Sequence, residues 1–186
     1  MDRIVFLDLE TTGLNPLTDD VLEVGIVVTD GSLHEIARRN WVIRSNPLTL
    51  TKCPPIVVTM HAESGLTAEC LAADAKSMFL VRDEVLQFLE QHDCKGAPLA
   101  GNSVGDFDRH FLRVNCAAVN DFLSHRSINV STFKVLFSMW VPDAAKPQLE
   151  RGKAHRALAD CDAAIAELRH WLKHLPDLHE AALTLA

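Results

Sequence analysis

The feature that most restricts the fold of this chain is a run of three strand-like segments at its start, joined by turns. The segments 3–9, 21–29 and 36–43 are rich in valine and isoleucine, which favour strands. Turn-forming residues separate them, at 11–16 after the first and at Asp30-Gly31 after the second. We therefore expect these segments to form an antiparallel meander.

Helical and strand-like segments alternate over the rest of the chain. The apolar periodicity predicts helices at 67–92, 106–114, 131–140 and 155–172, and buried strands at 98–102 and 128–130. The proline-bearing stretch 45–65 and the polar segment 146–153 are expected to be irregular. This order predicts an α/β fold with one mixed five-stranded sheet flanked by helices. We expect one domain over 1–175, followed by a C-terminal tail over 176–186.

Charge and cysteine content narrow the function classes. The formal net charge of −7 argues against tight binding to long duplexes, which needs a basic surface, but it leaves room for a small phosphate pocket. No apolar stretch approaches the ~20 residues of a membrane helix, so no membrane association is expected. The five cysteines contain no CxxC pair, which argues against a zinc site. Without a signal peptide, they fit reduced thiols in a cytoplasmic protein.

Asp8 and Glu10 stand two residues apart where the first buried strand ends. Residues with this spacing point to the same face of a strand. Two carboxylates placed in this way repel each other and lose hydration unless a cation lies between them. A hard divalent ion such as magnesium prefers such oxygen ligands. The pair therefore indicates a metal site, although an isolated pair could also lie in a solvated loop.

Asp108 occupies a similar junction farther along the chain. Gly101-Asn102-Ser103 leaves a short strand, and Asp108 lies early in the following helix, beside the apolar residues Phe107 and Phe111. The helix dipole favours an acid at such a position even when the acid has no further role. Asp106 is a near neighbour and a rival for the same task.

A histidine and an aspartate mark the start of the last expected helix. His155 follows a loop that contains Gly152, and Asp160 comes five residues later, beside the apolar stripe of the helix. Five residues leave two helical side chains roughly 140° apart, so the pair converges only if His155 hangs from the loop above the site. Taken singly, His155 could be an unengaged loop residue and Asp160 part of a solvated face.

Together, these three segments resemble the DEDDh exonuclease superfamily, which has four acids and one histidine in this order. Within it the chain is most similar to the oligoribonuclease family. The segments that carry the resemblance are 7–14, 60–66, 101–104, 129–134 and 155–160. The resemblance implies an RNase H-like fold and a 3′→5′ exoribonuclease that degrades short oligoribonucleotides to nucleoside 5′-monophosphates.

The resemblance also implies roles for the five residues. Asp8, Glu10, Asp108 and Asp160 would bind two divalent cations, Mg²⁺ or Mn²⁺, and hydrolysis would follow the two-metal-ion mechanism. His155 would be the catalytic general base, a task that suits an imidazole because its unperturbed pKa is about 6.5.

A pocket for the 5′-phosphate is a further expectation from the family. The matching candidates are Ser103, Arg126, Ser131 and Thr132, whose hydroxyl and guanidinium groups can donate hydrogen bonds to phosphate. Leu14 and His61 would line the base and the scissile phosphate. Ser131 could equally be the N-cap of the next helix, and Arg126 could form a surface ion pair.

Three positions depart from the family pattern. Ile56 stands where the family has a tryptophan that wedges against a base, His125 replaces a tyrosine, and Asn129 replaces an aspartate. Aromatic stacking supplies roughly 1–3 kcal/mol per base, so the change at Ile56 weakens the expected grip on a base. These departures leave the metal and base residues whole and leave the substrate range open.

Other functions are compatible with the same scaffold. One is a DNA or RNase T-like 3′→5′ exonuclease, and another is a binding module that holds short nucleotides without turnover. A third, weaker possibility is a metal phosphatase acting on small phosphate esters. The resemblance favours short single-stranded RNA of two to about five nucleotides as the partner, and it implies a homodimer.

Overall fold

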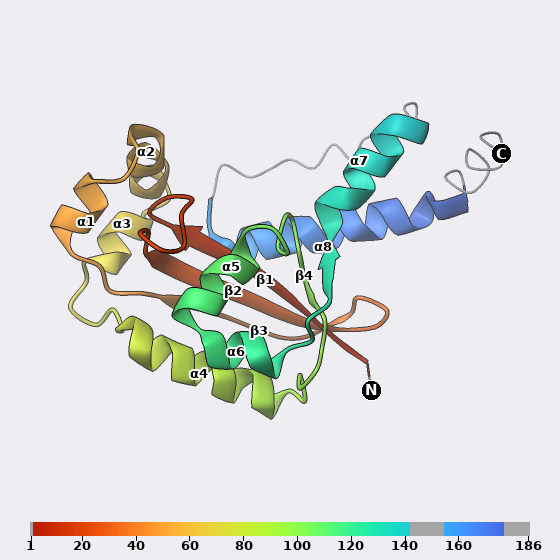
Figure 1. Cartoon of the computed structure of the whole chain (residues 1–186), viewed down its shortest axis with the longest axis horizontal. Coiled ribbons are helices and arrows are strands. Elements are labelled where there is room, and N and C mark those ends of the chain that lie inside the picture. The colour runs from red at the N-terminus through yellow and green to blue at the C-terminus, as the bar shows by residue number, and fades with distance from the viewer. Residues whose placement is uncertain (1, 142–154, 177–186) are drawn as a thin grey trace.

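A five-stranded mixed sheet with strand order β3-β2-β1-β4-β5 is the centre of the fold (Figure 1). The computed structural model describes residues 2–141 and 155–176. The antiparallel meander consists of β1 (Arg3–Thr11), β2 (Val21–Asp30) and β3 (Glu35–Val42). The parallel part adds β4 (Leu99–Gly101) beside β1, and β5 (Ser127–Asn129) beside β4. The predicted α/β class and the predicted five-stranded mixed sheet are confirmed.

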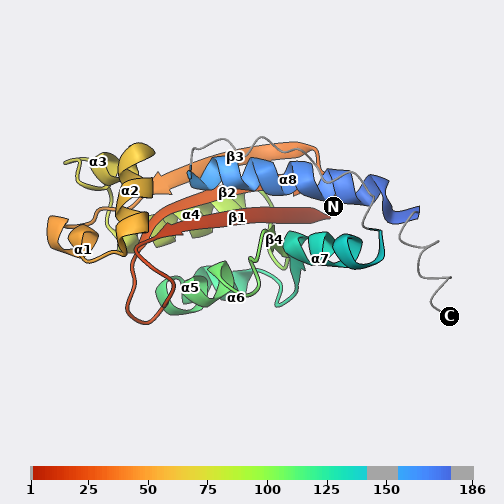
Figure 2. The ribbon, with the colours of Figure 1, turned by 90° about the horizontal axis from the view of Figure 1, so that it is seen from above.

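Helices cover both faces of the sheet and one of its ends. In the described residues they are α1 (Pro47–Thr51), α2 (Pro55–Glu63), α3 (Leu66–Cys70), α4 (Met78–Gln91), α5 (Asp108–Asn115), α6 (Ala117–Phe122), α7 (Val130–Trp140) and α8 (Ala157–Lys173). The helices α4, α5 and α6 pack against one face, and α8 packs against the other with α7 beside it (Figure 2). The short helices α1, α2 and α3 gather near the end of β1. No described helix is long and apolar enough to span a membrane.

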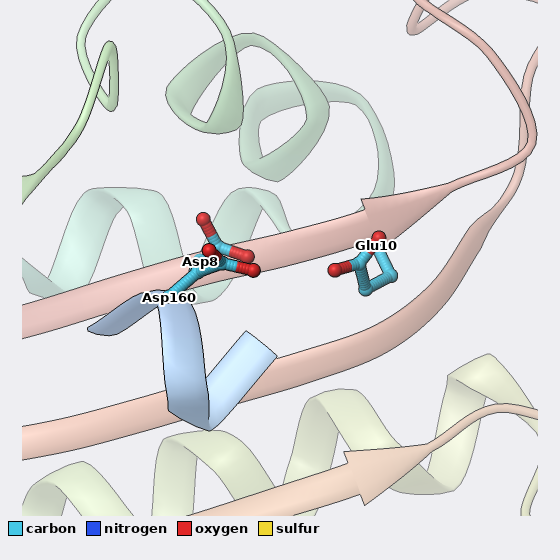
Figure 3. Close-up of side chains that lie close together, drawn as sticks. All are labelled: Asp8, Glu10 and Asp160. Atoms are coloured by element: carbon cyan, nitrogen blue, oxygen red, sulfur yellow. The ribbon is translucent and has the colours of Figure 1, made fainter. Parts of the chain in front are cut away.

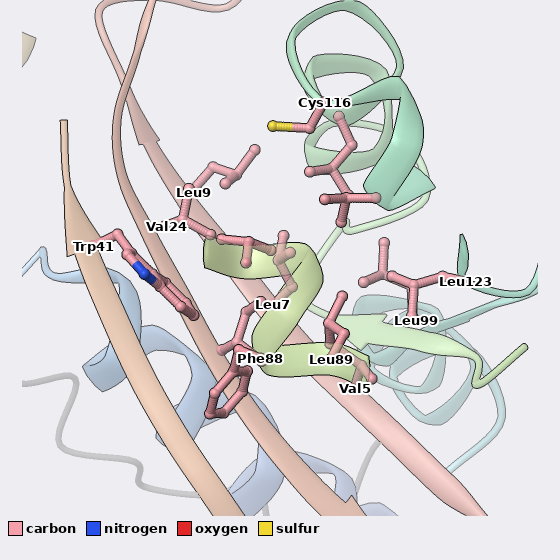
Figure 4. Packing of buried hydrophobic residues seen from close by; sticks show 14 of the residues in the cluster. Val5, Leu7, Leu9, Val24, Trp41, Phe88, Leu89, Leu99, Cys116 and Leu123 are labelled. Atoms are coloured by element: carbon pink, nitrogen blue, oxygen red, sulfur yellow. The ribbon is translucent and has the colours of Figure 1, made fainter. Parts of the chain in front are cut away.

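Side-chain alternation along β1 separates the core from the candidate site. Val5, Leu7 and Leu9 point to one face and pack against α4 in the larger apolar cluster (Figure 4). Phe6 points to the opposite face and packs against residues of α7 and α8. Because successive residues of a strand alternate in direction, Asp8 and Glu10 follow Phe6 onto the face that α8 covers.

Two sequence-based expectations were wrong in the region between β3 and β4. The expected single helix over 67–92 is divided into α3 and α4, because Lys76 in the intervening segment forms a parallel bridge with Ile43. The expected irregular stretch 45–65 contains α1 and α2. Proline stands in the first turn of both helices, where its fixed φ and missing amide hydrogen favour a helix start.

The remaining expected elements lie within one or two residues of those observed, and α6 is an additional helix. In α8, the buried apolar face ends at Trp171, and Leu172 is 42% exposed. The expected polar loop at 146–153, and the expected tail beyond residue 176, fall outside the described residues.

Candidate active site

Three carboxylates from two distant parts of the chain meet on one side of the sheet. Asp8 and Glu10 lie on the last part of β1, and Asp160 lies in the first turn of α8 (Figure 3). One oxygen from each carboxylate lies within 4.8 Å of the other two. The structure thus brings together the Asp8–Glu10 pair and Asp160, which are about 150 residues apart along the chain.

The close approach of α8 to the sheet depends on a glycine. Gly25 of β2 is the residue paired with Asp8 across the two strands. A Cβ atom at Gly25 would lie 2.6 Å from the carbonyl carbon of Ala157, the first residue of α8. Because no side chain fills this position, the first turn of α8 can lie directly on the backbone of β2. Asp160, in that turn, therefore reaches Asp8.

Asp108 joins the cluster from the edge of the sheet. The strand β4 pairs with β1 only at Val5 and Phe6, so no strand of the described residues lies beside the rest of this edge of β1. The amide of Leu9 instead donates a hydrogen bond to Asp108 Oδ1 at 2.9 Å. Asp108 is buried, whereas its rival Asp106 is exposed and accepts a hydrogen bond from the side chain of Asn129 at 2.8 Å.

Burial and mutual repulsion raise the pKa values of these carboxyl groups. Burial is the largest cause for each, and it raises the pKa of Asp8 well above its usual range, that of Glu10 to about 8 and that of Asp108 to about 7. The charges of Asp108 and Asp160 raise the pKa of Asp8 further, and the Arg156 guanidinium partly opposes the rise at Glu10. An excess of buried negative charge on hard oxygen donors fits divalent cations, which would supply the missing positive charge.

His155 lies two residues before the first residue of α8 and is exposed. Its backbone is in the left-handed region, with φ of 31°, so the chain changes direction sharply just before the helix. Its charge contributes to lowering the pKa of His61, for which burial is the main cause. His155 therefore lies within electrostatic reach of the buried His61.

His61 of α2 lies beneath the end of β1 and is only 1% exposed. Its Nε2 atom donates a hydrogen bond to the carbonyl oxygen of Thr11 at 2.9 Å, and its Nδ1 atom is 3.8 Å from Glu10 Oε2. These contacts tie α2 to the part of β1 that carries Glu10. His61 therefore supports the part of β1 that carries the candidate metal ligand Glu10.

The four candidates for the phosphate pocket divide into two groups. The Ser103 amide donates to Ser131 Oγ at 2.7 Å, and the two hydroxyl oxygens are 3.1 Å apart. Thr132 is exposed beside them. Arg126 is exposed at the opposite end of β5, and no hydrogen bond among the described residues joins its guanidinium to either serine. The helix-cap alternative for Ser131 is wrong, because α7 begins at Val130 and its N-cap is Asn129.

Sequence reasoning overlooked Arg109, which supports the segment that carries the phosphate-pocket candidate Arg126. Arg109 is buried, and its guanidinium donates hydrogen bonds to Ser127 Oγ at 3.0 Å and to the carbonyl oxygens of Ser124 and Arg126 at 2.9 and 3.3 Å. It thereby fixes the segment that carries Arg126. The sequence did contain a signal, since Arg109 is a charged residue among the apolar residues at the start of α5. A charge that is buried there needs hydrogen-bond partners.

The raised pKa values predict how stability depends on pH and metal. In metal-free protein, a carboxyl group with a raised pKa stabilises the fold while it is protonated, and this contribution is lost as pH rises through the folded pKa. For Glu10 the window runs from the ordinary value of 4.5 to about 8. One pKa unit corresponds to about 1.4 kcal/mol, and 1 kcal/mol moves the melting temperature of such a domain by roughly 2–4 °C.

We therefore expect the melting temperature in EDTA to fall by at least about 5 °C between about pH 5 and about pH 8. Saturating Mn²⁺ at the upper pH should restore it, because the cations replace the protons. Differential scanning calorimetry in both buffers measures this. A melting temperature in EDTA that rises over this range would contradict the described electrostatics.

The chain matches known exonucleases over most of its length. The model of the RNase_T exonuclease family covers residues 5–168. The oligoribonuclease of Streptomyces avermitilis is 39% identical over 177 residues, which covers 91% of this chain and 85% of that protein. The oligoribonuclease of Mycobacterium sp. (strain KMS) is 36% identical over 173 residues, covering 91% and 80%, and that of Pseudomonas fluorescens is 35% identical over 174 residues, covering 92% and 95%.

Solved structures of exonuclease I share the fold. One superposes with a TM-score of 0.73 at 16% identity, and covers 99% of this chain and 44% of that one. Exonuclease I of Methylocaldum szegediense superposes with a TM-score of 0.71 at 20% identity, covering 96% and 42%. This chain thus spans less than half of the exonuclease I chains. The family model and these relatives, of which 80–95% is covered, show that the chain belongs to the exonuclease family and, within it, to the oligoribonucleases.

Proposed function

We propose that this protein is a metal-dependent 3′→5′ exoribonuclease that hydrolyses short oligoribonucleotides to nucleoside 5′-monophosphates. The observation that carries the proposal is the meeting of Asp8, Glu10 and Asp160 in a chain that is 35–39% identical to oligoribonucleases. The name of these relatives supplies the substrate class. The carboxylate cluster supplies the means of cleaving a phosphodiester bond.

The four carboxylates Asp8, Glu10, Asp108 and Asp160 would hold two divalent cations, Mg²⁺ or Mn²⁺. When bound, such ions activate a water for attack on the phosphodiester and stabilise the departing 3′-oxygen. The protein prepares the ligands in advance. The Leu9 amide fixes one oxygen of Asp108, and the contact of His61 with Thr11 fixes the end of β1 that carries Glu10.

His155 would act as the general base. An imidazole can accept the proton of the attacking water near neutral pH and pass it on. The exposure of His155 at the start of α8 leaves its ring open to a substrate, and its neighbour His61 is bound to the backbone and buried. This difference in burial supports His155, and not His61, for the proton transfer.

The other end of a short RNA would be held away from the metals. We assign the 5′-phosphate to the Ser103 and Ser131 hydroxyls, with the neighbouring Thr132 and with Arg126, which precedes β5, as further candidates. Leu14, which is 83% exposed in the turn after β1, would contact a base. Because the net charge is −7, a long RNA gains little general attraction, and the two ends of a short RNA supply most of the binding.

Replacing Ser131 by alanine tests the phosphate end. We expect KM for a 5′-phosphorylated dinucleotide to rise about tenfold with kcat little changed, since a hydrogen bond to a charged group contributes about 1.5–3 kcal/mol. A dinucleotide with a 5′-hydroxyl should show no such rise. Ser138→Ala is the matched control, because Ser138 lies on the same helix and bonds only the Val135 carbonyl oxygen among described residues. Equal effects on both dinucleotides would remove Ser131 from the phosphate pocket.

We also propose a homodimer and a cytoplasmic location. Apolar side chains are exposed on α7 and near the end of α8, at Val135, Met139, Trp140, Leu172 and Leu175. Such a surface is suited to a second copy of the chain. All five cysteines are free and buried, which fits a reducing compartment. Light scattering on the purified protein measures the oligomeric state directly.

The function itself is tested with 5′-labelled RNAs of two to about twenty nucleotides and a DNA pentamer, in Mg²⁺ or Mn²⁺ and in EDTA. We expect fastest release of mononucleotides from the shortest RNAs, and none in EDTA. Equal cleavage of DNA or of long RNA would indicate a general exonuclease on the same scaffold. Binding without cleavage in either metal would indicate a nucleotide-binding module.

A further inference from the structure

A fifth carboxylate, Glu23, lies beside the candidate metal site and cannot be explained as a solvated side chain. Glu23 is 1% exposed on β2 and pairs directly with Glu10 of β1, so both side chains point to the same face. Its negative charge adds to the repulsion there and contributes to the raised pKa of both Asp8 and Glu10. A buried carboxylate that repels neighbouring carboxylates needs a positively charged partner.

That partner is Arg156. The Arg156 Nη2 atom donates to Glu23 Oε1 at 2.8 Å, and Nε lies 3.1 Å from both Glu23 oxygens. The other side of the same guanidinium binds Glu69 of α3, with Nη1 to Oε1 and Nη2 to Oε2 both at 2.8 Å. One planar cation therefore joins two carboxylates from β2 and α3. An arginine can do this because the five N–H donors of its planar guanidinium are fixed in a fork, whereas a lysine has only a single ammonium group.

Glu23 and Arg156 also form hydrogen bonds with the backbone of the first turn of α8, the turn that contains Asp160. Glu23 Oε2 also accepts a hydrogen bond from the Ala157 amide at 3.0 Å, and so caps the otherwise unpaired start of α8. The carbonyl oxygen of Arg156 accepts from the Asp160 amide at 3.1 Å, which closes the first turn. The residue before Arg156 is His155.

We propose that Glu23, Arg156 and Glu69 form an ion-pair clamp that fixes the first turn of α8 on β2, and thereby positions Asp160 for metal binding and His155 for catalysis. The three are positioning residues, since none of them is a proposed metal ligand or base. The effect of the clamp on catalysis rests on the proposed function. Its effect on metal binding does not depend on which substrate is cleaved.

The clamp works together with the glycine contact beneath the helix. Gly25 lets the first turn approach β2, and Glu23, two residues away on the same strand, holds it there. Glu69 extends the attachment to α3, which follows α2 and its residue His61 after a two-residue link. The supports of Asp160 and of Glu10 are thus joined through a single guanidinium.

The test compares Glu69→Gln and Arg156→Lys with Asp162→Asn. Glu69→Gln weakens the exposed half of the clamp and leaves the buried Glu23–Arg156 pair, so the chain should still fold. Arg156→Lys keeps the charge and loses the fork. Asp162→Asn is the matched control, because it breaks a different ion pair of α8, with Arg38 of β3 at 3.0 Å, beyond the first turn.

Two quantities are measured: the Mn²⁺ concentration for half-saturation, from electron paramagnetic resonance without RNA, and kcat and KM on a dinucleotide at saturating Mn²⁺. We expect both clamp variants to need about tenfold more Mn²⁺, the scale on which partners of metal ligands act, and to lose kcat with little change in KM. Asp162→Asn should match the parent protein in both quantities.

Unchanged half-saturation in Glu69→Gln and Arg156→Lys would overturn the clamp, whatever happens to their melting temperatures. A purely structural role would lower the melting temperature and leave the Mn²⁺ titration where it was. If the parent protein binds Mn²⁺ but cleaves no short RNA, the proposed function fails, and the Mn²⁺ titrations still decide for or against the clamp.

Discussion

Replacing Asp8 by asparagine is expected to abolish RNA cleavage and, in the same variant, to raise the melting temperature of the metal-free protein. Asp8 is a proposed metal ligand, and metal catalysis contributes several kcal/mol, which corresponds to a loss of at least about a thousandfold in kcat. The charges of Asp108, Asp160 and Glu10 all raise the pKa of the same carboxyl group. The neutral amide has nearly the same shape and removes that repulsion.

The two effects of Asp8→Asn are measured on one preparation, by mononucleotide release in Mn²⁺ and by calorimetry in EDTA at about pH 8. Asp106→Asn is the control, because Asp106 is an exposed acid bound to Asn129. It should keep both the activity and the melting temperature of the parent protein. If Asp8→Asn retained a tenth of the activity, the carboxylate cluster would not be the reaction site. A lowered melting temperature in EDTA would contradict the repulsion among these groups.

Replacing His155 by alanine is expected to separate catalysis from metal binding. A general base contributes about 10²–10⁴-fold to the rate, so kcat should fall by that amount. The affinity for Mn²⁺ and the melting temperature should stay unchanged, because the His155 side chain is exposed and is not a proposed ligand. This pattern differs from that of Asp8→Asn, which should lose activity together with a ligand.

Single-turnover cleavage of a dinucleotide at saturating Mn²⁺ measures the effect of His155→Ala on the chemical step. The matched control is His110→Ala, because His110 is also exposed and lies two residues from Asp108. Added imidazole should recover part of the lost rate if His155 acts by accepting a proton. A rate close to that of the parent protein would show that another group, or a hydroxide ion, takes the proton.

The sheet and the carboxylate cluster could be predicted from the sequence because both depend on local patterns. Strand periodicity alone places Asp8 and Glu10 on one face, and the order of segments gives the mixed sheet. Asp160 at the start of α8 could also be predicted as a site residue, since an acid beside an apolar stripe is visible in the sequence. What the sequence does not contain is the distance between α8 and β2, which depends on the contact at Gly25.

Some elements were missed because a local signal was misinterpreted, and others because they depend on distant partners. Pro47 and Pro55 were interpreted as breaks, yet each stands in the first turn of a helix. The long expected helix is divided by a bridge to Ile43, a residue more than thirty positions away from Lys76. Glu23 carried a usable signal, an acid inside the buried apolar run of β2, but its partner Arg156 lies 133 residues farther along the chain.

The short reach of β4 has a consequence for how this enzyme can be improved. A longer β4 would complete the hydrogen-bond ladder along β1 and would make a more regular sheet. The Leu9 amide would then bond to the longer strand, and Asp108 would lose the hydrogen bond that it accepts from this amide. Substitutions chosen only for thermal stability would therefore act against catalysis at this edge, if Asp108 is the metal ligand proposed above.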